Sequence, residues 1–270
     1  MWEKIEETVQ FIQKIVNYTP DYGIILGSGL GGFANDIQVE HKLEYKDIPN
    51  FPISTVEGHE GALLFGSIGN KKVMAMQGRF HFYEGYDMKQ VTFPVRVMKQ
   101  LGINKLIVSN ASGGVNPSFK VGDVMLITDH INMMPEHPLR GSNDTRFGPR
   151  FVNMSEPYSK DMNVKVRAIA HEKNIDLKEG VYLALQGPTF ETLAEYKMVK
   201  AVGADCVGMS TVPEVIVAKH MSMDCIGVSI ITDMGDEENI DEVNHEEVLE
   251  AAKKAEPIVR KLIKEFILTY

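Results

Sequence analysis

The stretch Tyr22-Gly-Ile-Ile-Leu-Gly-Ser-Gly-Leu-Gly-Gly32 joins a short apolar run to a loop that contains four glycines and a serine. The apolar residues Tyr22–Leu26 are typical of a short buried strand. Glycine lets the backbone turn sharply and approach a ligand closely, because it has no Cβ. Consecutive N–H groups in such a loop form a donor surface that suits an anion. The stretch therefore predicts a buried strand that leads into an anion-binding loop.

The same loop also has the spacing of a dinucleotide-binding fingerprint. Gly27, Gly29 and Gly32 fit the pattern G-x-G-x-x-G. The anion could be the pyrophosphate of a cofactor or a free phosphate, and the loop could also be a tight turn without a ligand. The stretch alone leaves these three interpretations open.

On either side of this loop, helical patterns alternate with short apolar runs. Helices are predicted over 5–16, 88–101, 161–173, 191–202, 213–221 and 245–270. Further strands are predicted over 63–68, 72–77, 103–109, 124–128, 180–185, 205–208 and 225–231. Gly69-Asn70 is expected to be a hairpin turn, and Pro94 is expected to kink or shorten its helix. A proline-rich stretch over 129–157 is expected to be irregular and functional or involved in contacts.

This alternation predicts an α/β fold, an α/β/α sandwich around a mixed, mostly parallel β-sheet. The composition shows no repeat or linker, so residues 1–270 are expected to form a single domain. In a fold of this class, ligands are expected to bind at the carboxyl ends of the strands.

The composition excludes several classes of protein. A net charge of −9 argues against a nucleic-acid partner, which requires a basic surface. No apolar run approaches the roughly 20 residues of a membrane span, and the N-terminus lacks the pattern of a signal peptide. Cys206 and Cys225 lie in apolar runs and are expected to be buried thiols of a reducing compartment. These observations predict a cytoplasmic protein without nucleic-acid or membrane partners.

Small, polar and charged residues follow six of the predicted strands. They occupy 27–29, 77–85, 109–114, 186–192, 208–214 and 232–233. Because ligands bind at this edge of an open α/β sheet, we expect these six segments to form one shared site.

The chemistry of these segments is limited. The sequence has no Cys-x-x-Cys, His-Glu-x-x-His or Gly-x-Ser-x-Gly motif, so it predicts neither a metal site nor a serine nucleophile. The groups that remain are two cationic or basic side chains, two hydroxyls and two acids: Arg79, His81, Ser28, Ser210, Glu191 and Asp233. This set suits a phosphate bound beside a polar heterocycle, with catalysis by positioning and electrostatics.

Each residue also has a structural alternative. Arg79 could form an ion pair, and His81 could be a hydrogen-bonded core histidine. Ser210 could cap a helix, Glu191 could be a first-turn acid, and Asn110 could make a turn hydrogen bond. Their joint placement at strand ends favours the functional interpretation.

Nine sequence motifs, found in the right order, resemble the trimeric, low-molecular-mass purine nucleoside phosphorylases over almost the whole chain. They are Gly27-Ser-Gly-Leu-Gly, Val56-Glu-Gly-His-Glu-Gly, Gln77-Gly-Arg-Phe-His-Phe-Tyr-Glu-Gly-Tyr, Ser109-Asn-Ala-Ser-Gly-Gly, His137-Pro-Leu-Arg-Gly, Arg146-Phe-Gly-Pro-Arg-Phe, Gly187-Pro-Thr-Phe-Glu-Thr, Gly208-Met-Ser-Thr-Val-Pro-Glu and Asn244-His-Glu-Glu-Val.

The resemblance implies reversible phosphorolysis in purine salvage. A purine (2′-deoxy)ribonucleoside and phosphate would give the free base and a pentose 1-phosphate. Phosphate would be a co-substrate, without a metal or an organic cofactor. The resemblance also implies a homotrimer in which Phe151 closes the ribose pocket of a neighbouring subunit.

The resemblance assigns roles to particular residues. The implied phosphate ligands are Ser28, His59, Arg79, Phe80, His81, the main chain of Ala111, and Ser210. The implied nucleoside-binding residues are Tyr83, Phe151, Phe190, Glu191, Met209, Asp233 and His245. The implied catalytic residues are His81, Asn110, Glu191 and Asp233.

One residue departs from the family pattern. Asp233 stands where the family usually has asparagine in the base site. An ionised aspartate can only accept hydrogen bonds, so it would repel a 6-oxo group and favour a 6-amino group. A protonated aspartate, its pKa raised by burial, would resemble asparagine. We therefore predict activity on 6-oxopurine nucleosides with some acceptance of adenosine.

Three alternatives follow from these observations. A 5′-methylthioadenosine phosphorylase also uses aspartate in its base site, but His245 suits a free 5′-hydroxyl. A nicotinamide-dependent dehydrogenase would need the glycine loop to open a helix and an acid about 20 residues later, near Glu44 or Asp47. A non-catalytic purine-binding protein would carry the same binding residues without turnover.

Overall fold

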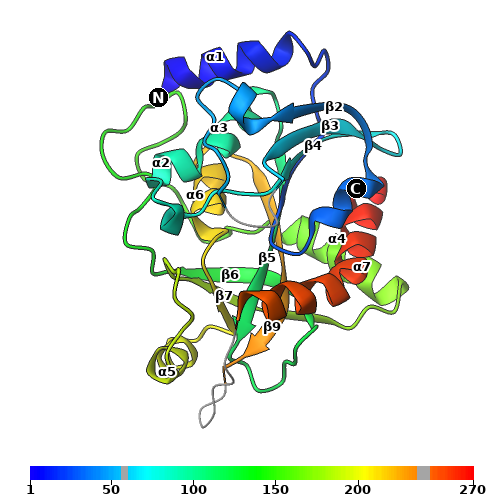
Figure 1. The fold of residues 1–270 in the computed structure, drawn as a ribbon, viewed down its shortest axis with the longest axis vertical. Helices are drawn as coiled ribbons and strands as arrows, with labels where there is room; N and C mark the ends of the chain where they lie inside the picture. The colour runs from blue at the N-terminus through cyan, green and yellow to red at the C-terminus, as the bar shows by residue number, and fades with distance from the viewer. Residues whose placement is uncertain (56–59, 236–243) are drawn as a thin grey trace.

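The computed structural model describes residues 1–55, 60–235 and 244–270. The strands of the described residues form one nine-stranded sheet in the order β2-β3-β4-β1-β5-β8-β7-β6-β9 (Figure 1). The strands are β1 (Tyr22–Leu26), β2 (Gln38–Glu44), β3 (Ala62–Ile68), β4 (Lys71–Gln77), β5 (Lys105–Gly114), β6 (Val124–Asn132), β7 (Leu177–Ala184), β8 (Cys206–Gly208) and β9 (Asp224–Met234).

The buried strand that leads into the glycine loop lies inside this sheet. All five residues of β1 are buried, and β1 pairs in parallel with β4 on one side and β5 on the other. β3 and β4 are antiparallel and joined at Gly69, whose φ of 59° suits the predicted hairpin turn. The predictions of a buried first strand and of this hairpin are confirmed.

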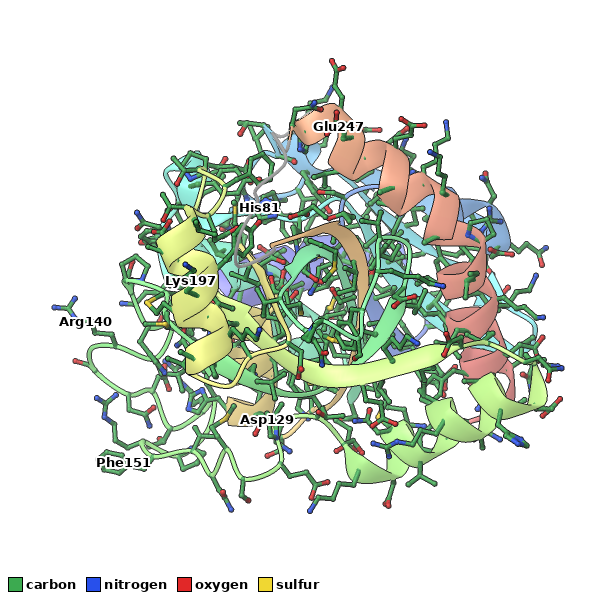
Figure 2. All side chains as sticks on the ribbon, turned by 90° about the horizontal axis from the view of Figure 1, so that it is seen from below. His81, Asp129, Arg140, Phe151, Lys197 and Glu247 are labelled. Carbon is green, nitrogen blue, oxygen red and sulfur yellow. The ribbon has the colours of Figure 1, made fainter. Side chains whose placement is uncertain are left out.

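The second half of the sheet closes on itself. β5 pairs with β8 and also in parallel with β9, so that β5, β8, β7, β6 and β9 form a ring of paired strands. Figure 2 looks onto this curled part of the sheet. The predicted α/β class and the mixed sheet are confirmed. The ring was not predicted, because the pairing of β5 with β9 is a long-range contact without a local sequence signal.

Helices cover both faces of the sheet. They are α1 (Trp2–Gln13), α2 (Met88–Val91), α3 (Phe93–Gln100), α4 (Lys160–Glu172), α5 (Leu193–Ala201), α6 (Val212–His220) and α7 (His245–Thr269). Residues of α1, α3 and α6 share one hydrophobic cluster, and residues of α4 and α7 share another (Figure 1). Among the described residues, none of these helices has both the length and the apolarity needed to cross a membrane.

Several predicted boundaries were wrong. The segment Ser109–Gly114, expected to follow a strand, belongs to β5, and β9 runs on to Met234. These polar residues stay in the strand because each pairs with the neighbouring strand of the ring. The helix predicted over 88–101 is divided into α2 and α3, with Pro94 in the first turn of α3, where its missing N–H costs little.

Two further differences concern segments without a clear pattern. β2 (Gln38–Glu44) was not predicted, because this edge strand is largely exposed and polar. The proline-rich segment was expected to be irregular from residue 129, but β6 continues to Asn132 by pairing with β7.

Candidate active site

A cavity of about 470 Å³ opens where the six predicted segments meet. Its walls include residues that follow β1, β4 and β7, residues within β5 and β9, and residues at the end of β8. The structure brings together most of the residues selected from the sequence: Ser28, Arg79, His81, Tyr83, Asn110, Ala111, Phe190, Glu191, Met209, Ser210, Asp233 and His245. They come from distant parts of the chain because the sheet collects the strand ends at one edge.

Two predicted residues lie elsewhere, and one is outside the described structure. The ring of Phe80 is buried against Tyr45 and Tyr86 in an aromatic cluster, so its side chain serves packing. Phe151 is 88% exposed and lies at the outer edge of the molecule, far from His81 (Figure 2). His59 falls outside the described residues.

The glycine loop is explained largely by close packing. A Cβ on Gly27 would lie 2.5 Å from the carbonyl oxygen of Ser109, so only a residue without a side chain fits where the loop crosses β5. The N–H of Gly27 donates to Ser109 Oγ at 3.3 Å. The loop continues into a 3₁₀ helix, Gly31–Asp36, rather than the α-helix of a dinucleotide-binding unit. Ser28 is the residue of this loop that lines the cavity.

Arg79 lines the cavity and is also part of a buried ion pair. Its Nε and Nη2 donate to the two carboxylate oxygens of Glu214 at 3.2 and 2.7 Å, and Nη1 donates to the carbonyl of Ser109 at 2.5 Å. The side chains of Arg79 and Glu214 are 1% and 3% exposed. A bidentate pair fixes the guanidinium rigidly, and so the structural alternative for Arg79 is also correct. Glu214 was not selected from the sequence.

His81 is held by Glu84, an acid that the sequence analysis missed. The backbone N–H of His81 donates to Glu84 Oε1 at 2.7 Å, and the ring nitrogen Nδ1 lies 3.3 Å from the same oxygen. The backbone N–H and the hydroxyl of Thr55 donate to Oε2 at 2.9 and 2.6 Å. The imidazole also stacks on Tyr83, with ring centroids 4.7 Å apart. The three-residue spacing between His81 and Glu84, typical of a capping box, was the available signal.

The pKa values in this group follow from burial and these hydrogen bonds. Burial lowers the pKa of His81, and the hydrogen bond with Glu84 opposes this effect. Burial alone would raise the pKa of Glu84, but the hydrogen bonds from His81 and Thr55 outweigh it and lower the pKa to about 2. Glu84 is therefore a carboxylate that orients a predominantly neutral imidazole.

A chain of hydrogen bonds fixes the amide of Asn110. The hydroxyl of Ser229 donates to Asn110 Oδ1 at 2.5 Å, and Asn110 Nδ2 donates to Thr211 Oγ1 at 2.7 Å. Thr211, with a φ of 68°, occupies the N-cap position of α6. Ser210 therefore precedes the cap, and the suggestion that Ser210 itself caps the helix is wrong.

Glu191 and Asp233 form the acidic part of the cavity. Asp233 accepts hydrogen bonds from the hydroxyl of Thr232 at 2.9 Å and from that of Tyr196 at 3.0 Å. Burial raises the pKa of Asp233, and the hydrogen bonds from these two donors partly counteract this rise. Burial, together with the charge of Asp233, raises the pKa of Glu191 to about 7. Glu191 is not a first-turn acid, because α5 begins at Leu193 after a capping box at Thr192.

The remaining predicted residues complete the walls. Phe190 lies two residues after the cis Gly187-Pro188 peptide and is 37% exposed. Met209 lies against Gly187, where a Cβ would collide with its side chain. His245 is the first residue of α7, whose N-cap Asn244 accepts from the N–H of Glu247 at 2.9 Å. An aromatic ring, a thioether and an imidazole thus line the cavity together with the basic and acidic groups.

Comparisons with known proteins identify the family of this chain. The sequence profile described as "Phosphorylase superfamily" matches residues 21–268. Purine nucleoside phosphorylase 1 of Bacillus subtilis (strain 168) is 49% identical over 270 residues, which is 100% of both chains. Purine nucleoside phosphorylase of Mus musculus is 46% identical, covering 97% of this chain and 93% of its own.

Solved structures show the same similarity. Schistosoma mansoni purine nucleoside phosphorylase in complex with adenosine has a TM-score of 0.94 and 39% identity, covering 99% of this chain and 97% of its own. Isoform 2 from the same organism, in complex with cytosine and ribose-1-phosphate, has a TM-score of 0.95 and 41% identity, with 99% and 96% covered. The chain belongs to the phosphorylase superfamily and, within it, to the purine nucleoside phosphorylases, which are pentosyltransferases.

Proposed function

We propose that this cavity catalyses reversible phosphorolysis of purine (2′-deoxy)ribonucleosides in purine salvage, with inorganic phosphate as co-substrate and without a metal or organic cofactor. The observation that carries this proposal is the lining of one cavity, which combines a basic and hydroxyl group (Arg79, His81, Ser28, Ser210) with an acidic pair (Glu191, Asp233). The first group suits a phosphate, and the second suits the edge of a purine.

The reaction requires opposite charges to be stabilised at the two parts of the cavity. When the glycosidic bond breaks, positive charge develops on the ribose and negative charge on the leaving purine. A phosphate dianion beneath the sugar stabilises the first, and hydrogen bonds or a proton at the purine stabilise the second. A preorganised contact of this kind is commonly worth about 3–4 kcal/mol when it is deleted.

The base preference follows from Asp233. As an ionised group it accepts from a 6-amino group, and as a protonated group it donates to a 6-oxo group. We expect activity on inosine and guanosine together with some activity on adenosine. In support, a Schistosoma mansoni purine nucleoside phosphorylase is described in complex with adenosine, and a schistosoma purine nucleoside phosphorylase in complex with hypoxanthine.

The assembly is also proposed. Phe151 is 88% exposed on the proline-rich segment, which suits a ring that reaches the ribose pocket of a neighbouring copy in a homotrimer. The two free cysteines are buried, in keeping with a reducing, cytoplasmic setting. The whole chain is expected to act as one domain.

The decisive experiment is an assay for release of hypoxanthine from inosine. We expect release that depends on inorganic phosphate and yields ribose 1-phosphate. Ser28→Ala should raise the Michaelis constant for phosphate. Folded protein that releases no base in the presence of phosphate would contradict the proposal.

A second measurement tests the base preference. Steady-state constants for inosine, guanosine and adenosine should be compared between the wild type and Asp233→Asn. The substitution should lower kcat/KM for adenosine relative to kcat/KM for inosine, because an amide donates to a 6-oxo group at every pH. A wild type inert towards adenosine would contradict the broadened preference while leaving the phosphorylase activity intact.

A further inference from the structure

Tyr196 contacts the acidic part of the cavity from within the protein. It lies on α5 with 3% of its surface exposed, in a hydrophobic cluster with Leu183, Val199 and Val207. Its hydroxyl donates to Asp233 Oδ2 at 3.0 Å. Tyr196 was not selected from the sequence, because a single tyrosine on a helix is typical of core packing.

Two glycines make space for this contact. A Cβ on Gly113 would lie 2.7 Å from Asp233 Oδ2 and 3.2 Å from Tyr196 Oη. A Cβ on Gly235 would collide with the ring of Tyr196. The absence of a Cβ at Gly113 and Gly235 therefore leaves room for the phenol of Tyr196 beside the carboxylate of Asp233.

The hydrogen bonds at Asp233 favour its ionised form. Tyr196 donates to Oδ2 and Thr232 to Oδ1, so both carboxylate oxygens act as acceptors. A protonated carboxyl group would offer a poorer acceptor to one of these donors. The same phenol also lowers the pKa of Glu191, but the pKa of Glu191 nevertheless rises to about 7 because of burial. The two donors to Asp233 thus favour placing a proton shared by the two acids on Glu191.

The position of this proton matches the pattern of a purine edge. A 6-aminopurine offers an acceptor at N1 and a donor at its amino group, which fits a protonated Glu191 and an ionised Asp233. A 6-oxopurine offers a donor at N1 and an acceptor at O6, which fits the opposite arrangement. A pair that carries one proton can therefore bind either base, and the base it prefers depends on which acid is protonated.

We propose that Tyr196 is a positioning residue for base specificity: its hydrogen bond directs the proton carried by Glu191 and Asp233 to Glu191, and so increases the acceptance of 6-aminopurine nucleosides. The inference rests on the proposed phosphorylase function. Among the described residues, the other titratable groups near the pair or on the cavity wall are Glu195, His245, Arg79, His81, Glu84 and Tyr83. Glu195 is engaged by the N–H and hydroxyl of Thr192, both at 2.8 Å.

The test compares kcat/KM for adenosine and inosine across about pH 5 to 9 in the wild type and in Tyr196→Phe. The variant keeps the ring but removes the donor, so the ratio of adenosine to inosine should fall about tenfold near pH 7. The pH at which this ratio rises should move upward, because Asp233 then ionises less readily. Tyr158→Phe, which removes a buried hydroxyl 3.2 Å from His130, is the matched control and should leave the ratio unchanged.

A second comparison separates positioning from a structural effect. In an Asp233→Asn background, Tyr196→Phe should leave the ratio unaltered, whereas general loosening of α5 would alter it in both backgrounds. An unchanged ratio and pH profile in Tyr196→Phe would overturn the inference, and so would a wild type that cleaves inosine but not adenosine. Failure of the wild type to cleave any purine nucleoside would instead contradict the proposed function.

Discussion

Glu84 and Glu191 line the same cavity, yet the protein shifts their pKa values in opposite directions. The pKa of Glu84 falls to about 2, because donors from His81 and Thr55 outweigh burial. The pKa of Glu191 rises to about 7, because burial and the charge of Asp233 outweigh its hydrogen bonds. Beside the basic group, the hydrogen bonds to Glu84 keep this acid ionised, whereas burial raises the pKa values of both members of the acidic pair. This difference suits an anion at the first and proton-dependent recognition of a base at the second.

The largest expected effect comes from breaking the compensation at Arg79. Glu214→Gln leaves a buried guanidinium without its carboxylate, and should lower the free energy of unfolding by about 3–5 kcal/mol. Urea unfolding of the wild type and Glu214→Gln at pH 7 measures this loss. The control is Glu179→Gln, which breaks the exposed Arg167–Glu179 pair and should cost less than about 1 kcal/mol. Equal losses in the two variants would show that burial of the Arg79 pair is unimportant.

The next effect concerns Glu84 and acid. Because its pKa in the folded protein lies below the ordinary 4.5, ionised Glu84 stabilises the fold above pH 4.5, and this contribution is lost as the pH falls towards about 2. Glu84→Gln should lower the free energy of unfolding by about 2–3 kcal/mol at pH 7. Unfolding curves from pH 2 to 7 should show the difference shrinking with acid. A difference that does not depend on pH would contradict the low pKa.

Glu191 should give the opposite sign. Its raised pKa means that the fold is more stable below pH 4.5 and loses stability as the pH rises towards about 7. Glu191→Gln removes this ionisation, so it should raise the free energy of unfolding by about 2 kcal/mol at alkaline pH and change little in acid. Glu195→Gln, a neighbour on α5 whose pKa is lowered, should produce no such gain. Stabilisation of equal size at all pH values would contradict this explanation.

The smallest effect tests one donor to Glu84. Thr55→Val keeps the backbone N–H but removes the hydroxyl that lies 2.6 Å from Glu84 Oε2. We expect the free energy of unfolding to fall by about 1 kcal/mol at pH 7. The pKa of Glu84 should rise, because one of its donors is lost. Thermal unfolding of Thr55→Val beside Glu84→Gln measures it. An unchanged stability would assign the low pKa of Glu84 to His81 and the backbone N–H.

The sequence predicted the members of the cavity better than their immediate partners. Ser28, His81 and Asp233 stood out because they follow strand patterns, and parallel strands bring such residues to one edge. Glu214 and Tyr196 lie within helices, where a buried acid or tyrosine carries no distinctive local pattern. Phe80 was selected with its motif, but its ring serves the aromatic core. A sequence motif does not show which way each of its side chains points.

The amino-acid sequence by itself determined the α/β class, the buried first strand and the segments that contribute to the cavity, because hydrophobic periodicity and turn residues act locally. The tertiary structure decided the ring of strands that the pairing of β5 with β9 closes, the packing that requires glycine at position 27, and the ionisation of the acids in the cavity. Those features depend on contacts between residues far apart in the chain, such as Arg79 with Glu214 and Tyr196 with Asp233. The pKa of a carboxyl group is set by the donors, charges and burial around it, and only the folded chain brings them together.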